Sequence, residues 1–287
     1  MLKHSTILKK DSVEAIAIGS FDGIHLGHRQ LIDKLGNNGA LFVIDKDQAN
    51  LTPGIKRSEV AGYPCMFYHF LKIKNLSGAE FVALLTKEFI HLKKIVVGYD
   101  FHFGQHRSCN VDDLKSLFNG VVEVVDEFSY NGVSIHSSAI RNFLKEGKII
   151  EANRFLGREY AMMGDIVVGQ GLGKKELVPT LNLKVLEYLI PKVGVYATRT
   201  RIGKVTYDSV SFIGKRVSTD GEFSIETHII GEEIEAVNSS VELFFVAFLR
   251  ENRKFDNLNM LKEQIYKDIA MAKENLKTCK LYFMDFL

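Results

Sequence analysis

Cysteine is scarce in this chain of 287 residues, which contains Cys65, Cys109 and Cys279. An odd number of widely separated cysteines does not make a disulfide framework. The sequence therefore favours a reducing compartment, and we expect a cytoplasmic protein. No two of the cysteines have the short spacing that is typical of a zinc site.

Long apolar runs are also lacking. The first ten residues, MLKHSTILKK, are too polar for a signal peptide. The most apolar later segment, residues 241–249, contains Glu242 and is much shorter than the roughly 20 residues that span a bilayer. We interpret it as a buried strand and expect no membrane partner.

A large net charge is absent, because 37 lysines and arginines nearly balance 35 acidic residues, which leaves +2. This balance does not favour nucleic-acid binding through bulk electrostatics. With 46% hydrophobic and 25% charged residues, the composition is that of a folded globular protein. The sequence also shows no internal repeat and no low-complexity linker.

The first half of the chain alternates strand and helix patterns. Residue spacing and caps, including a Ser77–Glu80 capping box, support the helices. This alternation predicts an α/β domain with a parallel sheet covered by helices. The expected strands are residues 13–19, 40–44, 95–98 and 121–125, and the expected helices are residues 26–35, 77–92, 110–118 and 138–145.

The pattern changes near Gly157. Short β-rich runs separated by turn residues follow, and they predict an antiparallel barrel or sandwich. An amphipathic helix is expected at residues 258–276. We therefore expect two domains, residues 1–157 and 158–287. The predicted strands of the second are residues 166–169, 193–199, 205–213, 224–230 and 241–249.

The stretch AIAIGSFDGIHLGH, residues 15–28, follows the first predicted strand directly. Ligands of open parallel sheets bind at the carboxyl ends of strands, and the start of a helix favours anions. Gly27 would allow a phosphate to approach closely, and His25 and His28 could donate hydrogen bonds to a polyphosphate. The alternative is two surface histidines beside a tight turn. The strand, the glycines and the following helix together favour the phosphate site.

GSFDGIHLGH resembles the HxGH signature of the nucleotidyltransferase superfamily. With its Phe-Asp-Gly it is similar to the bacterial bifunctional riboflavin kinase/FAD synthetase family. VGYDFHFGQHR, residues 97–107, and IHSSAIR, residues 135–141, resemble two further segments of that family. The resemblance implies a Rossmann-like first domain that adenylylates FMN to FAD with release of pyrophosphate.

The resemblance also implies roles for individual residues of the first domain. Catalysis would involve His25, His28 and Arg141. The alternative role of Ser138 is that of a helix cap, and the alternative for residues 100–107 is a turn whose aromatics belong to the core. ATP would contact Gly19, Phe21, Asp22, Gly27, Ser137 and Ser138, and the flavin would contact Asp100, Phe103 and Arg107.

The second half contains GDIVVGQGLGKKELVPTLNL, residues 164–183, whose glycines superficially suggest a dinucleotide loop. No helical pattern follows, so that reading lacks its structural context. The stretch is instead similar to the riboflavin kinase segment that ends in P-T-A-N-L. The similarity implies that Gly173, Thr180 and Asn182 bind ATP, and that Thr180 and Asn182 hold Mg²⁺, which prefers oxygen donors.

Further similarity to riboflavin kinases lies at residues 194–197, 225–229, 248–255 and 264–272. It implies that Glu226 is the general base for phosphoryl transfer and that Arg250 contacts the flavin. The residues alone would favour a solvated strand carboxylate for Glu226 and a strand-end charge for Arg250. In IETHI, strand alternation places Glu226 and His228 on the face opposite Ile225, Thr227 and Ile229.

Two segments depart from the family pattern. FVIDKDQANLTPG, residues 42–54, replaces a Phe-Asp-Pro-His-Pro-like segment, and residues 174–178 alter the kinase loop. We expect a bifunctional enzyme that binds riboflavin, FMN, FAD and ATP and needs Mg²⁺ for both reactions. The alternatives are a FAD synthetase with a degenerate kinase domain, a non-catalytic flavin-binding regulator, and a transferase with another acceptor. The sequence does not specify an oligomeric state.

Overall fold

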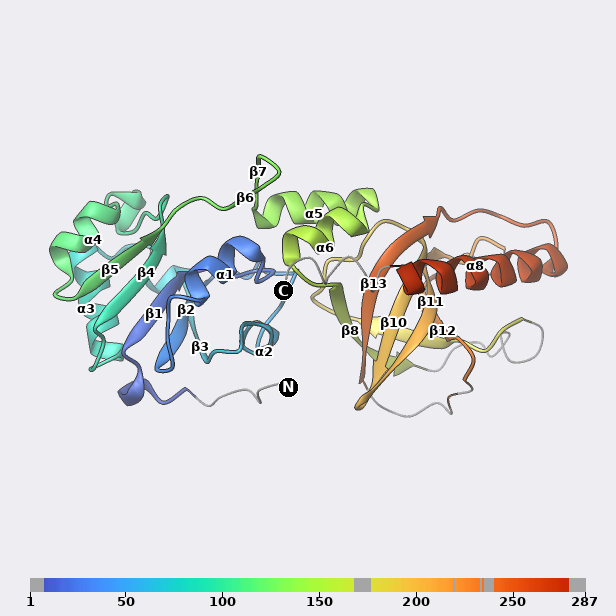
Figure 1. The fold of residues 1–287 in the computed structure, drawn as a ribbon, viewed down its shortest axis with the longest axis horizontal. Coiled ribbons are helices and arrows are strands. Elements are labelled where there is room, and N and C mark those ends of the chain that lie inside the picture. Colours follow the sequence, from blue (N-terminus) through green and yellow to red (C-terminus); the bar gives the residue numbers. More distant parts are fainter. Residues whose placement is uncertain (1–7, 168–176, 219, 233, 235–239, 279–287) are drawn as a thin grey trace. The chain divides into compact units, whose positions relative to one another are not determined.

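The computed structural model describes residues 8–167, 177–218, 220–232, 234 and 240–278 (Figure 1). The chain forms two compact units, which meet in the sequence between Ser137 and Ser138. Each unit has its own sheet and its own hydrophobic core.

The first unit contains a five-stranded parallel sheet in the order β3-β2-β1-β4-β5. This arrangement confirms the predicted α/β class, and it adds β3, which the sequence pattern did not indicate. The strands are β1 (Ala15–Gly19), β2 (Gly39–Asp45), β3 (Cys65–His69), β4 (Lys94–Gly98) and β5 (Val121–Val125). A small hairpin of β6 (Ser129–Tyr130) and β7 (Val133–Ser134) follows.

Helices connect these strands. The capping box between Ser77 and Glu80 is present at the start of α3, as the sequence predicted. The helices are α1 (Leu26–Ile32), α2 (Lys56–Ala61), α3 (Gly78–Glu88) and α4 (Val111–Leu117), with 3-10 turns η1 (Lys10–Ser12), η2 (Phe70–Lys72) and η3 (Gln105–Arg107).

Both faces of the parallel sheet are buried. Along β1, Ile16 and Ile18 belong to one hydrophobic cluster, whereas Ala15 and Ala17 belong to the other. Successive side chains of a strand point to opposite faces, so this division shows a core on each side of the sheet. In the strand order, β1 has β2 on one side and β4 on the other. Such a point, where the order reverses, leaves a crevice at the carboxyl ends of the strands.

The second unit is a closed antiparallel barrel in the order β10-β11-β12-β9-β8-β13, which confirms the predicted barrel. The C-terminal helix contributes Ala272 and Leu276 to the apolar cluster on the barrel. The strands are β8 (Tyr160–Val167), β9 (Leu181–Val185), β10 (Gly194–Ile202), β11 (Val205–Lys215), β12 (Phe223–Ile229) and β13 (Ser240–Arg250), and the helices are α5 (Ser137–Glu146), α6 (Ile149–Leu156) and α8 (Leu258–Thr278).

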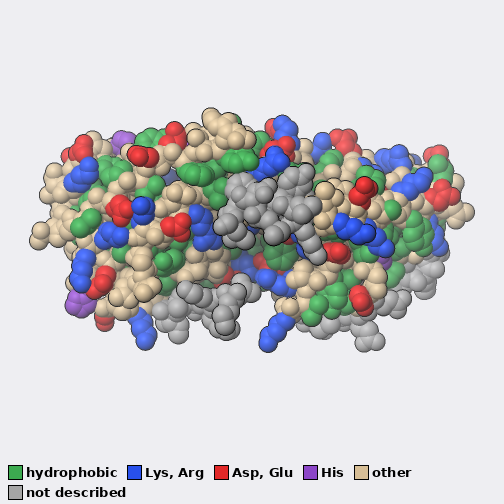
Figure 2. Space-filling view, in the orientation of Figure 1, with side chains coloured by type: hydrophobic (Ala, Val, Ile, Leu, Met, Phe, Trp, Pro, Cys, Tyr) green, Lys and Arg blue, Asp and Glu red, His purple; other side chains and the backbone are tan. Residues whose placement is uncertain are grey.

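The surface mixes both signs of charge. On the face shown in Figure 2, basic and acidic side chains are interspersed over the described parts of the chain. Among the described residues, no helix is both long enough and apolar enough to cross a membrane.

Helix α6 is anchored in the barrel, although it precedes the predicted domain boundary at Gly157. The buried Asn153 donates from Nδ2 to the carbonyl of Phe245 at 2.8 Å. Its Oδ1 accepts from the N–H of Tyr160 at 2.7 Å. Phe155 and Leu156 are also buried. A chain cut at residue 157 would therefore remove packing and hydrogen bonds from the barrel, and the functional boundary at that residue stays a prediction.

We predict that a fragment of residues 138–287 is more stable than one of residues 158–287. Each lost hydrogen bond contributes about 1 kcal/mol and each exposed apolar side chain about 2 kcal/mol. The shorter fragment should therefore lose on the order of 5 kcal/mol in the free energy of unfolding, as measured by urea denaturation. Equal denaturation midpoints would show that α5 and α6 do not stabilise the barrel.

Two candidate active sites

A cavity of about 410 Å³ lies at the carboxyl ends of the strands of the first unit. Its walls include Gly19 at the end of β1, Lys46 after β2, Tyr99 after β4 and Asp126 after β5. Ser137, at the start of α5, completes the wall. The cavity therefore occupies the crevice that the strand order creates.

His25 and His28 both line this cavity. His25 is the N-cap of α1, and its Nδ1 accepts from the backbone N–H of His28 at 3.3 Å. The two imidazoles stack, with centroids 3.6 Å apart and planes 16° apart. Because Nδ1 of His25 is an acceptor, the proton of the neutral ring lies on Nε2, which is then a hydrogen-bond donor.

Two predicted glycines make room for aromatic rings. A Cβ on Gly27 would lie 3.3 Å from the imidazole of His25, and a Cβ on Gly19 would lie 3.3 Å from the ring of Phe21. Phe21 is fully buried and its ring is 5.1 Å from that of His28. Both glycines and Phe21 line the cavity, and they also pack the histidines.

The backbone between β1 and α1 is left-handed at three positions. The φ angles are 50° at Phe21, 93° at Gly23 and 41° at Ile24. For residues other than glycine this conformation costs roughly 1–3 kcal/mol each, so surrounding contacts must hold it. Phe21 and Ile24 are both fully buried.

Asp22 lies in this loop, but the structure does not bring it to the cavity wall. Its carboxylate is buried and accepts from the backbone N–H groups of Asn50, Leu51 and Thr52 at 2.9–3.3 Å. Where the sequence resemblance implied a contact with ATP, the geometry shows a carboxylate that holds residues 50–52.

Ser137 does line the cavity, and its Oγ donates to the carbonyl of Asp22 at 2.7 Å. Ser138 and Arg141 follow on α5, with Arg141 one turn after Ser138. These two residues belong to the second unit, so their contact with ATP stays a prediction.

Of the predicted flavin-binding residues, the structure places Asp100 and Arg107 at the cavity. Phe103 instead lies in the hydrophobic core, where its ring stacks with Phe101 at 5.6 Å. Within the same segment, Tyr99 and Phe101 line the cavity instead. Phe101 and Phe103 are two residues apart, so strand alternation alone would place both rings on one face, and the sequence does not show which ring enters the core.

Other cavity residues carry polar groups that the sequence analysis did not single out. They share positions just after the strands, which is the signal that would have found them. These residues are Lys46, Tyr99, His102, Asp126, Glu127 and His136. For one of them, Glu127, a hydrogen bond from the Ser134 hydroxyl, together with Tyr99 and His136, lowers the pKa, so this carboxylate stays ionised near neutral pH.

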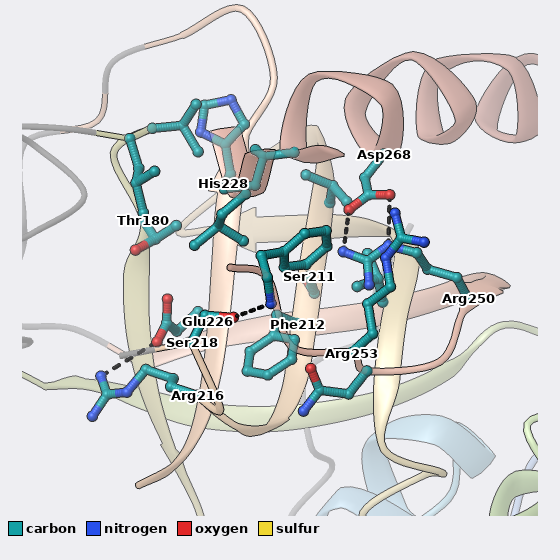
Figure 3. Close-up of a pocket in the computed structure, with 18 of the residues that line it drawn as sticks. Thr180, Ser211, Phe212, Arg216, Ser218, Glu226, His228, Arg250, Arg253 and Asp268 are labelled. Atoms are coloured by element: carbon teal, nitrogen blue, oxygen red, sulfur yellow. Dashed lines mark hydrogen bonds and ion pairs between the residues drawn. The ribbon is translucent and has the colours of Figure 1, made fainter. Parts of the chain in front are cut away.

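A second cavity, of about 160 Å³, opens in the barrel (Figure 3). Thr180, Glu226 and His228 line it, and the Nδ1 of His228 lies 2.8 Å from the carbonyl of Pro179. On β12, Ile225, Thr227 and Ile229 are buried whereas Glu226 and His228 are partly exposed, so the predicted alternation is present.

The two oxygen donors proposed for a metal lie on β9 and just before it. Thr180 lines the cavity, whereas Asn182 is not among the residues of the cavity wall. Asn182 is the direct cross-strand partner of Glu226, and Thr180 lies two residues before Asn182. Among the described residues, no group of three or more His, Cys, Asp or Glu side chains gathers as a metal site. The donors fit Mg²⁺, because this ion keeps waters and substrate phosphates as its other ligands. Gly173 lies outside the described residues.

Arg216 makes an ion-pair contact with the Glu226 carboxylate. Its Nη1 lies 3.4 Å from Oε1 of Glu226 (Figure 3). Nε and Nη2 of the same guanidinium donate to the two oxygens of Asp220 at 2.9 and 2.7 Å. A bidentate pair fixes the plane of a guanidinium, so Glu226 faces a cation whose orientation is set.

Arg250 also lines the barrel cavity and is held in the same way. Nε and Nη2 donate to the buried carboxylate of Asp268 on α8 at 2.8 and 2.6 Å (Figure 3). The guanidinium lies 5.8 Å from the ring centroid of Phe255. The sequence analysis missed Asp268 and Arg216, because a charge on a helix or near a turn usually faces solvent.

Five hydroxyl groups form a closed ring of hydrogen bonds inside the barrel. Each contacts two others at 2.7–3.2 Å, so each can donate one bond and accept another. Ser211 of this ring lines the cavity, and Thr227 is adjacent to Glu226 in the chain. A fully satisfied buried network is rigid, so the ring supports the strand that presents Glu226. Its members are Thr198, Thr200, Ser209, Ser211 and Thr227.

Comparison with known proteins agrees with the division into two sites. A family model described as FAD synthetase matches residues 7–41 and 56–139, and one described as riboflavin kinase matches residues 156–276. The first match leaves out residues 42–55, which include the segment 42–54 that departs from the family pattern.

Individual proteins resemble nearly the whole chain. The bifunctional riboflavin kinase/FMN adenylyltransferase of Listeria monocytogenes is 30% identical and covers 90% of this chain and 91% of its own length. That of Escherichia coli K12 is 27% identical, over 90% of this chain and 91% of its own. A crystal structure described as a macrolide-efflux protein from Streptococcus pneumoniae superposes with a TM-score of 0.82. It is 26% identical and covers 91% of this chain and 94% of its own.

Proposed function

The chain belongs to the family of bifunctional riboflavin kinase/FMN adenylyltransferases, and on this premise we propose how its two cavities share the work. The protein is an ATP-using enzyme of flavin cofactor biosynthesis. The barrel transfers the γ-phosphate of ATP to riboflavin, which gives FMN and ADP. The α/β unit transfers AMP from ATP to FMN, which gives FAD and pyrophosphate. We place both reactions in the cytoplasm, as the scarce cysteines suggest.

In the kinase reaction, Glu226 accepts the proton of the terminal ribityl hydroxyl as its oxygen attacks the γ-phosphorus. Support comes from its position on the cavity wall beside Thr180 and across from Asn182. These two residues would hold Mg²⁺, which neutralises phosphate charge when it is bound. Arg250, held flat by Asp268, offers a planar surface to the flavin.

In the adenylyl transfer, a phosphate oxygen of FMN attacks the α-phosphorus of ATP and pyrophosphate leaves. His25 and His28 donate hydrogen bonds to the phosphates and stabilise the charge that develops there. Their shared place on the cavity wall, with fixed stacking, is the observation that carries this proposal. Ser138 and Arg141 add a second set of anion donors, and Asp100, Phe101 and Arg107 contact the flavin.

A single-activity enzyme or a non-catalytic regulator is not favoured, because both family matches are present and the named relatives are bifunctional. The barrel also keeps a carboxylate beside the predicted ATP-binding oxygens, which a binding module would not need.

We predict that His28→Ala lowers the rate of FAD formation by on the order of 10²-fold, as for loss of an oxyanion donor. FMN formation from riboflavin should persist, because the barrel performs it. Chromatography of flavins after incubation with riboflavin, ATP and Mg²⁺ measures both products. FAD synthesis at the wild-type rate would remove His28 from the site.

We predict that Glu226→Gln lowers the kcat of FMN formation by ~10²–10⁴-fold, because glutamine cannot accept the proton. The KM values for riboflavin and ATP should stay close to those of the wild type, and conversion of supplied FMN to FAD should not change. A variant that kept its kcat and lost ATP affinity would make Glu226 a ligand and not the base.

We predict that Thr180→Val raises the Mg²⁺ concentration that half-saturates FMN formation, since an oxygen ligand is lost. A Mg²⁺ titration of both reactions tests this, and the dependence of FAD formation on Mg²⁺ serves as the control within the same molecule. An unchanged Mg²⁺ dependence of FMN formation would exclude Thr180 as a metal ligand.

A further inference from the structure

Arg57, on α2, is a charged residue buried to 2% exposure in the first unit. Its Nε donates to the carbonyl of Thr52 at 3.1 Å, and its Nη1 donates to the carbonyl of Ser20 at 3.1 Å. Nη2 lies 3.6 Å from Oδ2 of Asp45. The guanidinium also lies 5.0 Å from the ring centroid of Phe67.

Burial of a guanidinium is costly unless its donors find partners, so these contacts fix the position of Arg57. One of them reaches the residue before Phe21, where the left-handed loop begins. Asp22 connects the same two segments, the loop and residues 50–52. Its carboxylate accepts hydrogen bonds from the backbone of residues 50–52, whereas Arg57 donates hydrogen bonds to backbone carbonyls. Two oppositely charged side chains thus link residues 20–22 to residues 50–52.

Residues 50–52 and Asp45 lie in the internal gap of the FAD synthetase family match, residues 42–55. Asp45, Thr52 and the three N–H donors all lie within it. The start of α5 contributes one further tie, from the Ser137 hydroxyl to the carbonyl of Asp22. The loop that leads into His25 is therefore held through the Asp22 side chain and through the backbone carbonyls of Ser20 and Asp22.

We propose that Asp22 and Arg57 are positioning residues for adenylyl transfer. They touch neither nucleotide nor flavin. They keep Phe21 and Ile24 in their left-handed conformation, and that conformation sets where His25 and His28 stand in the cavity. The inference rests on the proposed assignment of adenylyl transfer to this cavity.

The test compares Arg57→Met, Arg57→Lys and Asp22→Asn with a matched control, Arg29→Met. Arg29 lies on α1 beside His28 in the sequence, and its guanidinium donates to the carbonyls of Val60 and Ala61 at the end of α2. It therefore joins α1 to α2 and, unlike Arg57, does not contact the backbone of residue 20. For each variant, kcat and the KM for ATP are measured for FAD formation, with FMN formation as a control in the same molecule.

Arg57→Met and Asp22→Asn should lower the kcat of FAD formation by roughly 10- to 100-fold, because small displacements of catalytic groups have effects of this size. The KM for ATP should change less than about threefold, since the donors remain present. The kcat of Arg57→Lys should lie between those of the wild type and Arg57→Met, because a lysine keeps the charge but its ammonium lacks the planar fork that reaches both carbonyls. Arg29→Met should keep its kcat, even if its melting temperature falls equally. Equal kcat losses in Arg29→Met and Arg57→Met, or no loss in Arg57→Met, would overturn the proposal.

Amide hydrogen exchange of residues 21–28 supplies a readout that does not need turnover. It should be faster than wild type in Arg57→Lys and Asp22→Asn and unchanged in Arg29→Met. If Arg57→Met does not fold, these milder variants decide the matter. If the wild type makes no FAD, the proposed function fails, while the exchange rates still show whether the two residues hold the loop. Unchanged exchange in both milder variants would contradict the proposal.

Discussion

The proposed site of adenylyl transfer depends on one backbone constraint, the left-handed path between β1 and α1. That path makes His25 the N-cap of α1, where its Nδ1 accepts a hydrogen bond from the backbone N–H of His28. The cap determines which nitrogen of His25 carries the proton, and the stacking of the two rings determines where His28 lies. A Cβ at Gly27 would lie 3.3 Å from the His25 ring, so this glycine allows the helix start to approach the imidazole closely.

In the barrel site, too, the surroundings fix the orientation of side chains that line the cavity, but here ion pairs do so and not a backbone conformation. Arg250 and Arg216 each receive a bidentate carboxylate, from Asp268 and Asp220, and thereby present a fixed plane to the cavity. The strand that carries Glu226 is supported from inside by the closed ring of hydroxyl groups. In both sites the proposed reactive side chains thus lie on or beside elements that caps, ion pairs and hydrogen bonds hold in place, which restricts their motion.

The two folds and the positions of several candidate site residues could be predicted from the sequence, because they depend on the pattern of neighbouring residues. Strand alternation predicted the face of Glu226, and the strand-glycine-helix context predicted where His25 and His28 lie. Long-range contacts could not be predicted in this way. Phe103 and Phe101 have the same local pattern, yet one enters the core and the other lines the cavity. Arg57 resembles a surface residue of a short helix, and one of the two carbonyls that accept its hydrogen bonds, that of Ser20, lies far away in the sequence.

The tautomer of His25 tests this account most directly, since protonation states are assigned from hydrogen-bond geometry. Nitrogen-15 NMR of histidine-labelled protein, recorded at a pH where the His25 ring is neutral, reports which ring nitrogen bears the proton. The account predicts an unprotonated Nδ1 that accepts a hydrogen bond, with the proton on Nε2. A proton on Nδ1 of His25 would mean that it does not cap α1, and the geometry proposed for adenylyl transfer would be wrong.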